Sequence, residues 1–146
     1  MFVIKKTTHL IINYLFAYKI RMKILLIDDN KDITTMLSKY LTLKGHSCSV
    51  SNNGHNGLNM ITANQCDAVL LDFAMPEFSG VNIVEELYKN GKIAKLNIVA
   101  LTASSVSSDR EEHLKMMGVK AILKKPIDPD ELLEYLQQFD LKLTQR

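Results

Sequence analysis

The chain has 146 residues and a formal net charge of +2, and 47% of its residues are hydrophobic while 23% are charged. This composition excludes a largely disordered chain and suits one domain with a single core. Two isolated cysteines, Cys48 and Cys66, provide no disulfide framework, and the four histidines have no metal-ligand spacing. We therefore expect a cytoplasmic protein without a zinc site.

The first 21 residues differ in charge from the rest of the chain. They hold four basic residues and no acid, whereas residues 22–146 hold 14 basic and 16 acidic residues and show no electrostatic footprint for nucleic-acid binding. The apolar stretch at residues 10–18 is far shorter than the roughly 20 residues of a membrane-spanning helix, so we expect no membrane span. Residues 1–21 are interpreted as an N-terminal extension of a domain at residues 22–146. The extension is an over-extended start or disordered tail, a docked or membrane-surface helix, or a targeting segment. The helix remains open because apolar side chains have helical spacing at Leu10, Ile11, Tyr14, Leu15 and Tyr18.

The first strand and helix of the domain are predicted at its start. Lys23–Ile27 is an apolar, strand-like run that ends directly before Asp28 and Asp29. A helix follows, with Gly45 as its stop, because apolar residues repeat at helical spacing at Ile33, Met36, Leu37, Tyr40 and Leu41.

The middle of the chain predicts two more strands and two more helices. Ser47–Ser51 is a strand, and a weaker helix at Gly57–Asn64 follows the turn-rich segment Asn52-Asn53-Gly54. Ala68–Leu71 is a buried strand that ends on Asp72, before a turn marked by Pro76. The third helix contains Val81, Val84, Leu87 and Tyr88 and closes at Asn90-Gly91.

The last third predicts two strands and two helices. Asn97–Leu101 is a strand followed by Thr102, and Ser108-Asp109-Arg110-Glu111 is interpreted as the capping box of a helix that ends near Gly118. Ala121–Leu123 is the fifth strand. Asp128 is the expected N-cap of the fifth helix, with Pro129 at its first position, and its inward-facing residues are Leu132, Leu133, Leu136 and Phe139.

Strands that alternate with helices predict an α/β fold, a doubly wound five-stranded parallel sheet flanked by five helices. The carboxyl ends of parallel strands share one edge of the sheet, where ligands bind. We therefore expect five side chains to meet there: Asp28, Asp29, Asp72, Thr102 and Lys125.

These side chains have a common chemistry. Three carboxylates in one cleft disfavour one another's ionisation, and a hard divalent cation such as Mg²⁺ relieves the repulsion. Lys125 and Thr102 suit phosphoryl oxygens, and a metal-supported carboxylate such as Asp72 is a known nucleophile for phosphoryl transfer. Plainer roles remain open: helix capping by Asp28, Asp29 or Asn30, turn formation by Asp72, and Lys124 as the functional lysine instead of its neighbour.

This set of residues, together with Met75-Pro76, Gly80, Ala103 and Pro126, resembles the receiver domain of two-component response regulators between Met22 and Phe139. The resemblance implies a flavodoxin-like strand order 2-1-3-4-5 and a chemotaxis-type single-domain receiver. It implies Asp72 as the phosphoacceptor from a histidine kinase or histidine phosphotransfer protein. It also implies magnesium held by Asp29, Asp72 and the Ala74 backbone carbonyl, with Asp28 holding a metal-bound water. Thr102 is then the switch hydroxyl and Lys125 the phosphate-pairing cation, followed by a cis peptide at Pro126.

The output is less clear from the sequence. Ile122 stands where many receivers carry an aromatic residue before the Lys–Pro pair, so rotation of a ring cannot be the readout. Seven residues follow Phe139, and we expect signalling through an unknown output protein, at a face made by the fourth helix, fifth strand and fifth helix.

Two rival functions remain open: a phosphorylation-independent interaction module and a phosphorelay intermediate. A hydrolase is disfavoured because Ala74 stands where aspartyl-dependent phosphatases have a second acid. We also expect Lys125 to behave as a surface lysine that contributes little to stability.

Overall fold

The computed structural model describes residues 21–103 and 106–144, with side chains as far as Phe139. Apart from Arg21, the predicted extension at residues 1–21 lies outside the described residues. Within the described part, no helix is both long enough and apolar enough to cross a membrane.

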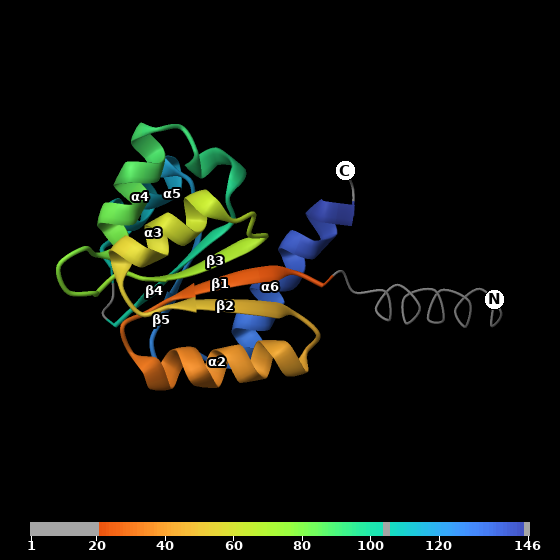
Figure 1. Ribbon diagram of the computed structural model, residues 1–146. Coiled ribbons are helices and arrows are strands. Elements are labelled where there is room, and N and C mark those ends of the chain that lie inside the picture. The colour runs from red at the N-terminus through yellow and green to blue at the C-terminus, as the bar shows by residue number, and fades with distance from the viewer. Residues whose placement is uncertain (1–20, 104–105, 145–146) are drawn as a thin grey trace.

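Five parallel strands form one sheet in the described chain: β1 (Lys23–Ile27), β2 (Ser47–Ser51), β3 (Ala68–Asp72), β4 (Ile98–Thr102) and β5 (Val119–Lys124). Their order is β2-β1-β3-β4-β5 (Figure 1), which confirms the predicted doubly wound α/β fold and strand order. The strand order reverses beside β1, so β1 and β3 lie next to each other although α2, β2 and α3 separate them in the chain.

Helices cover both faces of this sheet (Figure 1). Helices α2 (Lys31–Leu43) and α6 (Pro129–Thr144) lie on one face, and α3 (Gly54–Ala63), α4 (Gly80–Lys89) and α5 (Ser108–Met117) lie on the other. A short 3-10 helix, η1 (Ile93–Lys95), precedes β4 and was not predicted. Because successive strand residues point to opposite faces, Leu26 joins the core beneath α2 and α6, while Ile27 joins the core beneath the other three helices.

Each of two helices, α3 and α5, has a start or a cap that differs from the sequence prediction. Asn53 has an extended backbone and accepts a hydrogen bond from the Asn56 N–H, so α3 begins at Gly54 and not at Gly57. Helix α5 is capped by Ser107, whose hydroxyl accepts from the Arg110 N–H. The predicted capping box is therefore wrong, because the cap lies one residue earlier and Glu111 no longer stands at its third position.

The predicted cap of α6 is confirmed, because the Asp128 carboxylate accepts hydrogen bonds from the N–H groups of Asp130 and Glu131. The predicted inward side chains of α6 also pack as expected. Leu132, Leu136 and Phe139 are buried, and Leu133 is partly buried against the same core.

Candidate acidic site

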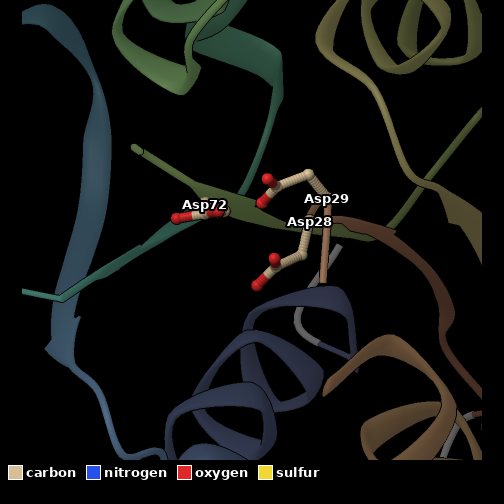
Figure 2. Close-up of side chains that lie close together, drawn as sticks. All are labelled: Asp28, Asp29 and Asp72. Carbon is tan, nitrogen blue, oxygen red and sulfur yellow. The ribbon is translucent and has the colours of Figure 1, made fainter. Parts of the chain in front are cut away.

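Three carboxylates meet at the carboxyl end of the sheet. Asp28 and Asp29 directly follow β1, and Asp72 is the last residue of β3, which pairs with β1 up to Ile27 and Leu71. One oxygen from each acid lies within 4.8 Å of the others, and Figure 2 shows the three side chains gathered at this rim. Asp28 and Asp72 are each 2% exposed, whereas Asp29 faces solvent. The predicted convergence of the acids is confirmed.

Lys125 lies beside the two buried acids. Its Nζ is 2.8 Å from Asp28 Oδ2 and 3.4 Å from Asp72 Oδ1. Its neighbour Lys124 is exposed, so Lys125 and not Lys124 is the lysine that contacts the acids. The Lys125–Pro126 peptide is cis, as the resemblance implied.

The expectation of a surface lysine is wrong. The Lys125 side chain is 18% exposed and lies between two carboxylates that water scarcely reaches. Burial acts to lower the pKa of Lys125, but its hydrogen bond to Asp28 and the charges of Asp28 and Asp72 outweigh this effect, so the pKa is raised. The ammonium is therefore held in its charged form by the acids.

Helix capping does not account for the acid pair. The cap of α2 is Asn30, whose side-chain oxygen accepts from the N–H groups of Asp32 and Ile33. Asp28 instead accepts from the Asn30 N–H at 2.9 Å through Oδ1, which directs its second oxygen to Lys125. Because Asn30 caps α2, neither Asp28 nor Asp29 serves as the cap of that helix.

Asp72 makes a turn hydrogen bond, and its surroundings disfavour the ionised form of its carboxylate. Its Oδ1 accepts a hydrogen bond from the Ala74 N–H at 3.0 Å, so the plain turn role and the rim position occur together. Burial raises the pKa of Asp72, and the nearby Asp28 charge raises it further, although the Ala74 N–H and Lys125 oppose both effects. The ionised form is thus held at a free-energy cost.

The loop between β3 and α4 packs closely against two helix starts. A Cβ on Gly80 would lie 2.2 Å from the Asp72 carbonyl oxygen, and a Cβ on Gly54 would lie 2.0 Å from the Phe78 carbonyl oxygen. Only glycine permits both approaches. The motif residue Gly80 therefore has a steric role next to Asp72.

The remaining predicted residues lie at or near the same rim. Thr102 is the last residue of β4 and is 7% exposed. It comes one position after Leu101, which pairs with Asp72 between the adjacent strands β4 and β3. Ala74 is exposed and contacts Asp72 through its N–H. The roles of the Thr102 hydroxyl and the Ala74 carbonyl stay predictions.

A small polar network behind the acid pair was missed by the sequence interpretation. Asn52 Nδ2 donates to the Asp28 carbonyl at 2.8 Å and to Thr34 Oγ1 at 3.1 Å. The segment Asn52-Asn53-Gly54 had been interpreted only as a turn signal. Its place after a strand adjacent to β1 was the available clue.

The donor set fits a hard divalent cation. Three carboxylates gather at this rim and one lysine, Lys125, contacts two of them, so negative charge is in excess and the available ligand atoms are oxygens. Mg²⁺ prefers one or two carboxylates with water and phosphate oxygens over an all-protein cage. An exposed Asp29 beside two buried acids leaves the site open to such ligands.

Comparisons with known proteins agree with this geometry. The protein-family model for the response regulator receiver domain matches residues 24–137 of the chain. The chain is 30% identical over 114 residues to the probable transcriptional regulator ycf29 of Pyropia yezoensis, which covers 78% of this chain and 51% of that protein. It thus spans about half the length of several curated relatives that it matches.

Solved structures share the fold. The receiver domain of the Francisella response regulator 1452 has a TM-score of 0.77 at 24% identity, over 84% of this chain and 99% of that one. The response regulator TrrA of Thermotoga maritima, in complex with Mg²⁺ and BeF, has a TM-score of 0.68 at 28% identity, over 81% of this chain and 98% of that one. The chain therefore belongs to the response regulator receiver domain family of two-component systems, and it is a signalling module rather than an enzyme.

Proposed function

We propose that the chain is a phosphoacceptor response regulator of the cytoplasm that receives a phosphoryl group on Asp72 in the presence of Mg²⁺. The donor is the phosphohistidine of a histidine kinase or of a histidine phosphotransfer protein. The observation that carries the proposal is the position of Asp72, a buried acid with a raised pKa that lies beside a second buried acid and 3.4 Å from the Lys125 Nζ.

In the proposed reaction, an Asp72 carboxylate oxygen attacks the phosphorus of the phosphohistidine. A P–O bond forms, the P–N bond breaks, and the imidazole nitrogen keeps the electron pair of that bond. When bound, Mg²⁺ neutralises charge on the phosphoryl oxygens. TrrA, a relative with 28% identity, was solved with Mg²⁺ and BeF, which supports this choice of cofactor.

The other residues of the rim have supporting roles in the proposal. Asp29, Asp72 and the Ala74 carbonyl hold the metal, and Asp28 holds a metal-bound water. Lys125 pairs with a phosphoryl oxygen, for which its Nζ is already placed 3.4 Å from an Asp72 oxygen. Thr102, buried at the end of β4, is the hydroxyl that responds to the phosphoryl group.

The phosphorylated chain then signals through a partner protein and not through nucleic acid. The proposed contact face comprises α5, β5 and α6. Ile122 is partly buried against the core shared with α3, α4 and α5. An aliphatic side chain in that place makes the response independent of an aromatic ring.

The test is direct phosphorylation. The protein is incubated with acetyl phosphate and Mg²⁺, and its intact mass is measured. We expect a gain of one phosphoryl group, lost in Asp72→Asn and kept in the matched control Asp67→Asn, whose acid lies at the opposite end of the sheet. A phosphoryl group on the Asp72→Asn variant would contradict the assignment of the acceptor.

A second candidate function is supported by Ile122. The chain is then a receiver-fold interaction module whose affinity for its partner does not depend on phosphorylation. The same experiment decides: an unchanged mass with acetyl phosphate, and also with a phosphorylated kinase, supports this candidate. If the label instead passes on to a histidine phosphotransfer protein in a time course, the chain is a phosphorelay intermediate.

A further inference from the structure

Asp28 and Asp29 are held in different ways, although they are adjacent. Every polar group of Asp28 is bonded: its N–H to the Ser51 carbonyl at 3.1 Å, its carboxylate to the Asn30 N–H and to Lys125, and its carbonyl to Asn52. The Asp29 carboxylate accepts no hydrogen bond from any of the described residues and is exposed. The direction of Asp29 must therefore come from its backbone.

The backbone of Asp29 begins at the peptide that Asn52 contacts. The Asp28 carbonyl belongs to the planar peptide unit that also contains the Asp29 nitrogen and Cα. A hydrogen bond of 2.8 Å from Asn52 Nδ2 to this carbonyl fixes the orientation of that plane. Fixing the plane limits where the Asp29 side chain can point.

Asn52 is itself anchored. The same Nδ2 donates to Thr34 Oγ1 at 3.1 Å, and the Thr34 hydroxyl donates to the Lys31 carbonyl at 3.1 Å in the first turn of α2. Thr34 is 3% exposed. The amide thus joins the loop after β2, the end of β1 and the first turn of α2, and it is restrained on two sides.

We propose that Asn52 is a positioning residue of the acidic site: its amide orients the Asp28–Asp29 peptide and thereby directs the Asp29 carboxylate toward the Mg²⁺ position. This inference rests on the proposed function, because it assigns Asn52 to the metal site of the phosphoacceptor. A purely structural role, in which Asn52 only fastens two loops, predicts lost stability without lost metal affinity.

Magnesium affinity of the full chain separates these two roles. The metal-free protein is titrated with Mg²⁺, and backbone amide shifts of the rim residues are followed by NMR. For Asn52→Ala we expect affinity about tenfold weaker, the lower end of the loss that follows removal of an outer partner of a metal ligand. Asn52→Leu, which keeps side-chain bulk but donates no hydrogen bond, should show the same loss and guards against a folding defect in the alanine variant.

Asn53→Ala serves as the matched control for stability, because it removes the cap of α3 at the adjacent position. It should lower the melting temperature while magnesium affinity stays within about twofold of wild type, because the Asn53 side chain does not touch the Asp28 carbonyl.

The outcomes are distinct. Wild-type affinity in both Asn52 variants, with normal magnesium binding by the wild-type chain, overturns the inference and leaves the proposed function standing. Absence of magnesium binding by the wild-type chain contradicts the proposed metal site itself, and the positioning role with it.

Discussion

The two rims of the sheet, at the amino and carboxyl ends of its strands, differ in the number and surroundings of their acidic side chains. At the amino-terminal rim, Asp67 is half-buried, its carboxylate accepts from the Lys23 N–H at 2.7 Å, and its carbonyl accepts from the Asn97 side chain at 2.9 Å. Among the residues that the structure describes, Asp67 belongs to no group of three acids, histidines or cysteines that could hold a metal ion. At the carboxyl-terminal rim, three acids gather, and the two buried ones, Asp28 and Asp72, contact Lys125.

This contrast shows where the fold departs from its most stable arrangement. Both rims belong to the same sheet, whose strands pair in the same parallel pattern along their length. The difference therefore lies in the side chains at the strand ends. Buried like charges are retained where a ligand or a reaction needs them. This contrast supports the proposed function at the carboxyl-terminal rim, and it can be tested by changing charges at each rim.

The largest expected effect comes from Lys125→Met. This change leaves the buried carboxylates of Asp28 and Asp72 without their cation. We expect a loss of about 2 kcal/mol in the free energy of unfolding without Mg²⁺, less than the ~3–5 kcal/mol of a fully buried pair because Lys125 still reaches water. Urea unfolding measures the loss. Lys124→Met, at the exposed neighbouring position, is the control and should change stability by no more than about 0.5 kcal/mol.

Magnesium should stabilise the folded chain. At a free Mg²⁺ concentration ten times the dissociation constant, binding to the native state adds about 1.4 kcal/mol to the free energy of unfolding. Thermal melting with and without Mg²⁺, at matched ionic strength, checks this effect. Asp29→Asn should reduce the shift, and a wild-type melting temperature that stays constant at millimolar Mg²⁺ would count against the metal site.

The pH dependence should reveal the strain at Asp72. Because burial and Asp28 raise its pKa above the unfolded value, the folded state binds the proton more tightly. Its contribution to stability is fully present below the unfolded pKa and is lost as pH rises through the raised folded pKa. Without Mg²⁺, the wild-type chain should lose stability relative to Asp72→Asn across this window. Equal pH profiles of the two proteins in urea unfolding would show that Asp72 is not strained.

The smallest effect is expected at the opposite rim. Asp67→Asn keeps an oxygen that can accept from the Lys23 N–H, and the site is partly open to water. Stability should change by no more than about 0.5 kcal/mol, and the magnesium-induced shift in melting temperature should be unchanged. A smaller magnesium-induced shift in this variant would mean that the amino-terminal rim affects the metal site, contrary to the expected independence of the two rims.

The fold was largely predictable because the buried strands are continuous apolar runs. β1 occurs at its predicted bounds, and β3 and β4 differ from theirs by one residue at one or both ends. β2 also occurs at its predicted bounds, although it is an edge strand with exposed residues and not an apolar run. The fifth strand was predicted too short, at Ala121–Leu123, because β5 is an edge strand with an exposed Lys120 near its start. A search for continuous apolar runs misses such alternation of buried and exposed residues.

The acids and the lysine were predictable because parallel strands bring their carboxyl ends together whatever the loops do. Asn52 and Thr34 were not, because their contacts depend on how the loop after β2 folds back on α2. The cap of α5 was misplaced for a related reason. Ser107 and Ser108 are equally good caps in sequence, and only the backbone conformation selects the first.

The two close glycine contacts restrict how the chain can change shape. Residues 73–79 are confined at both ends, by the Asp72 carbonyl against Gly80 and by the Phe78 carbonyl against Gly54. Displacing this segment toward either helix would drive a backbone oxygen into the start of that helix. A larger side chain at Gly54 or Gly80 would therefore displace this segment or the helix start, so the position of the loop beside Asp72 depends on both glycines.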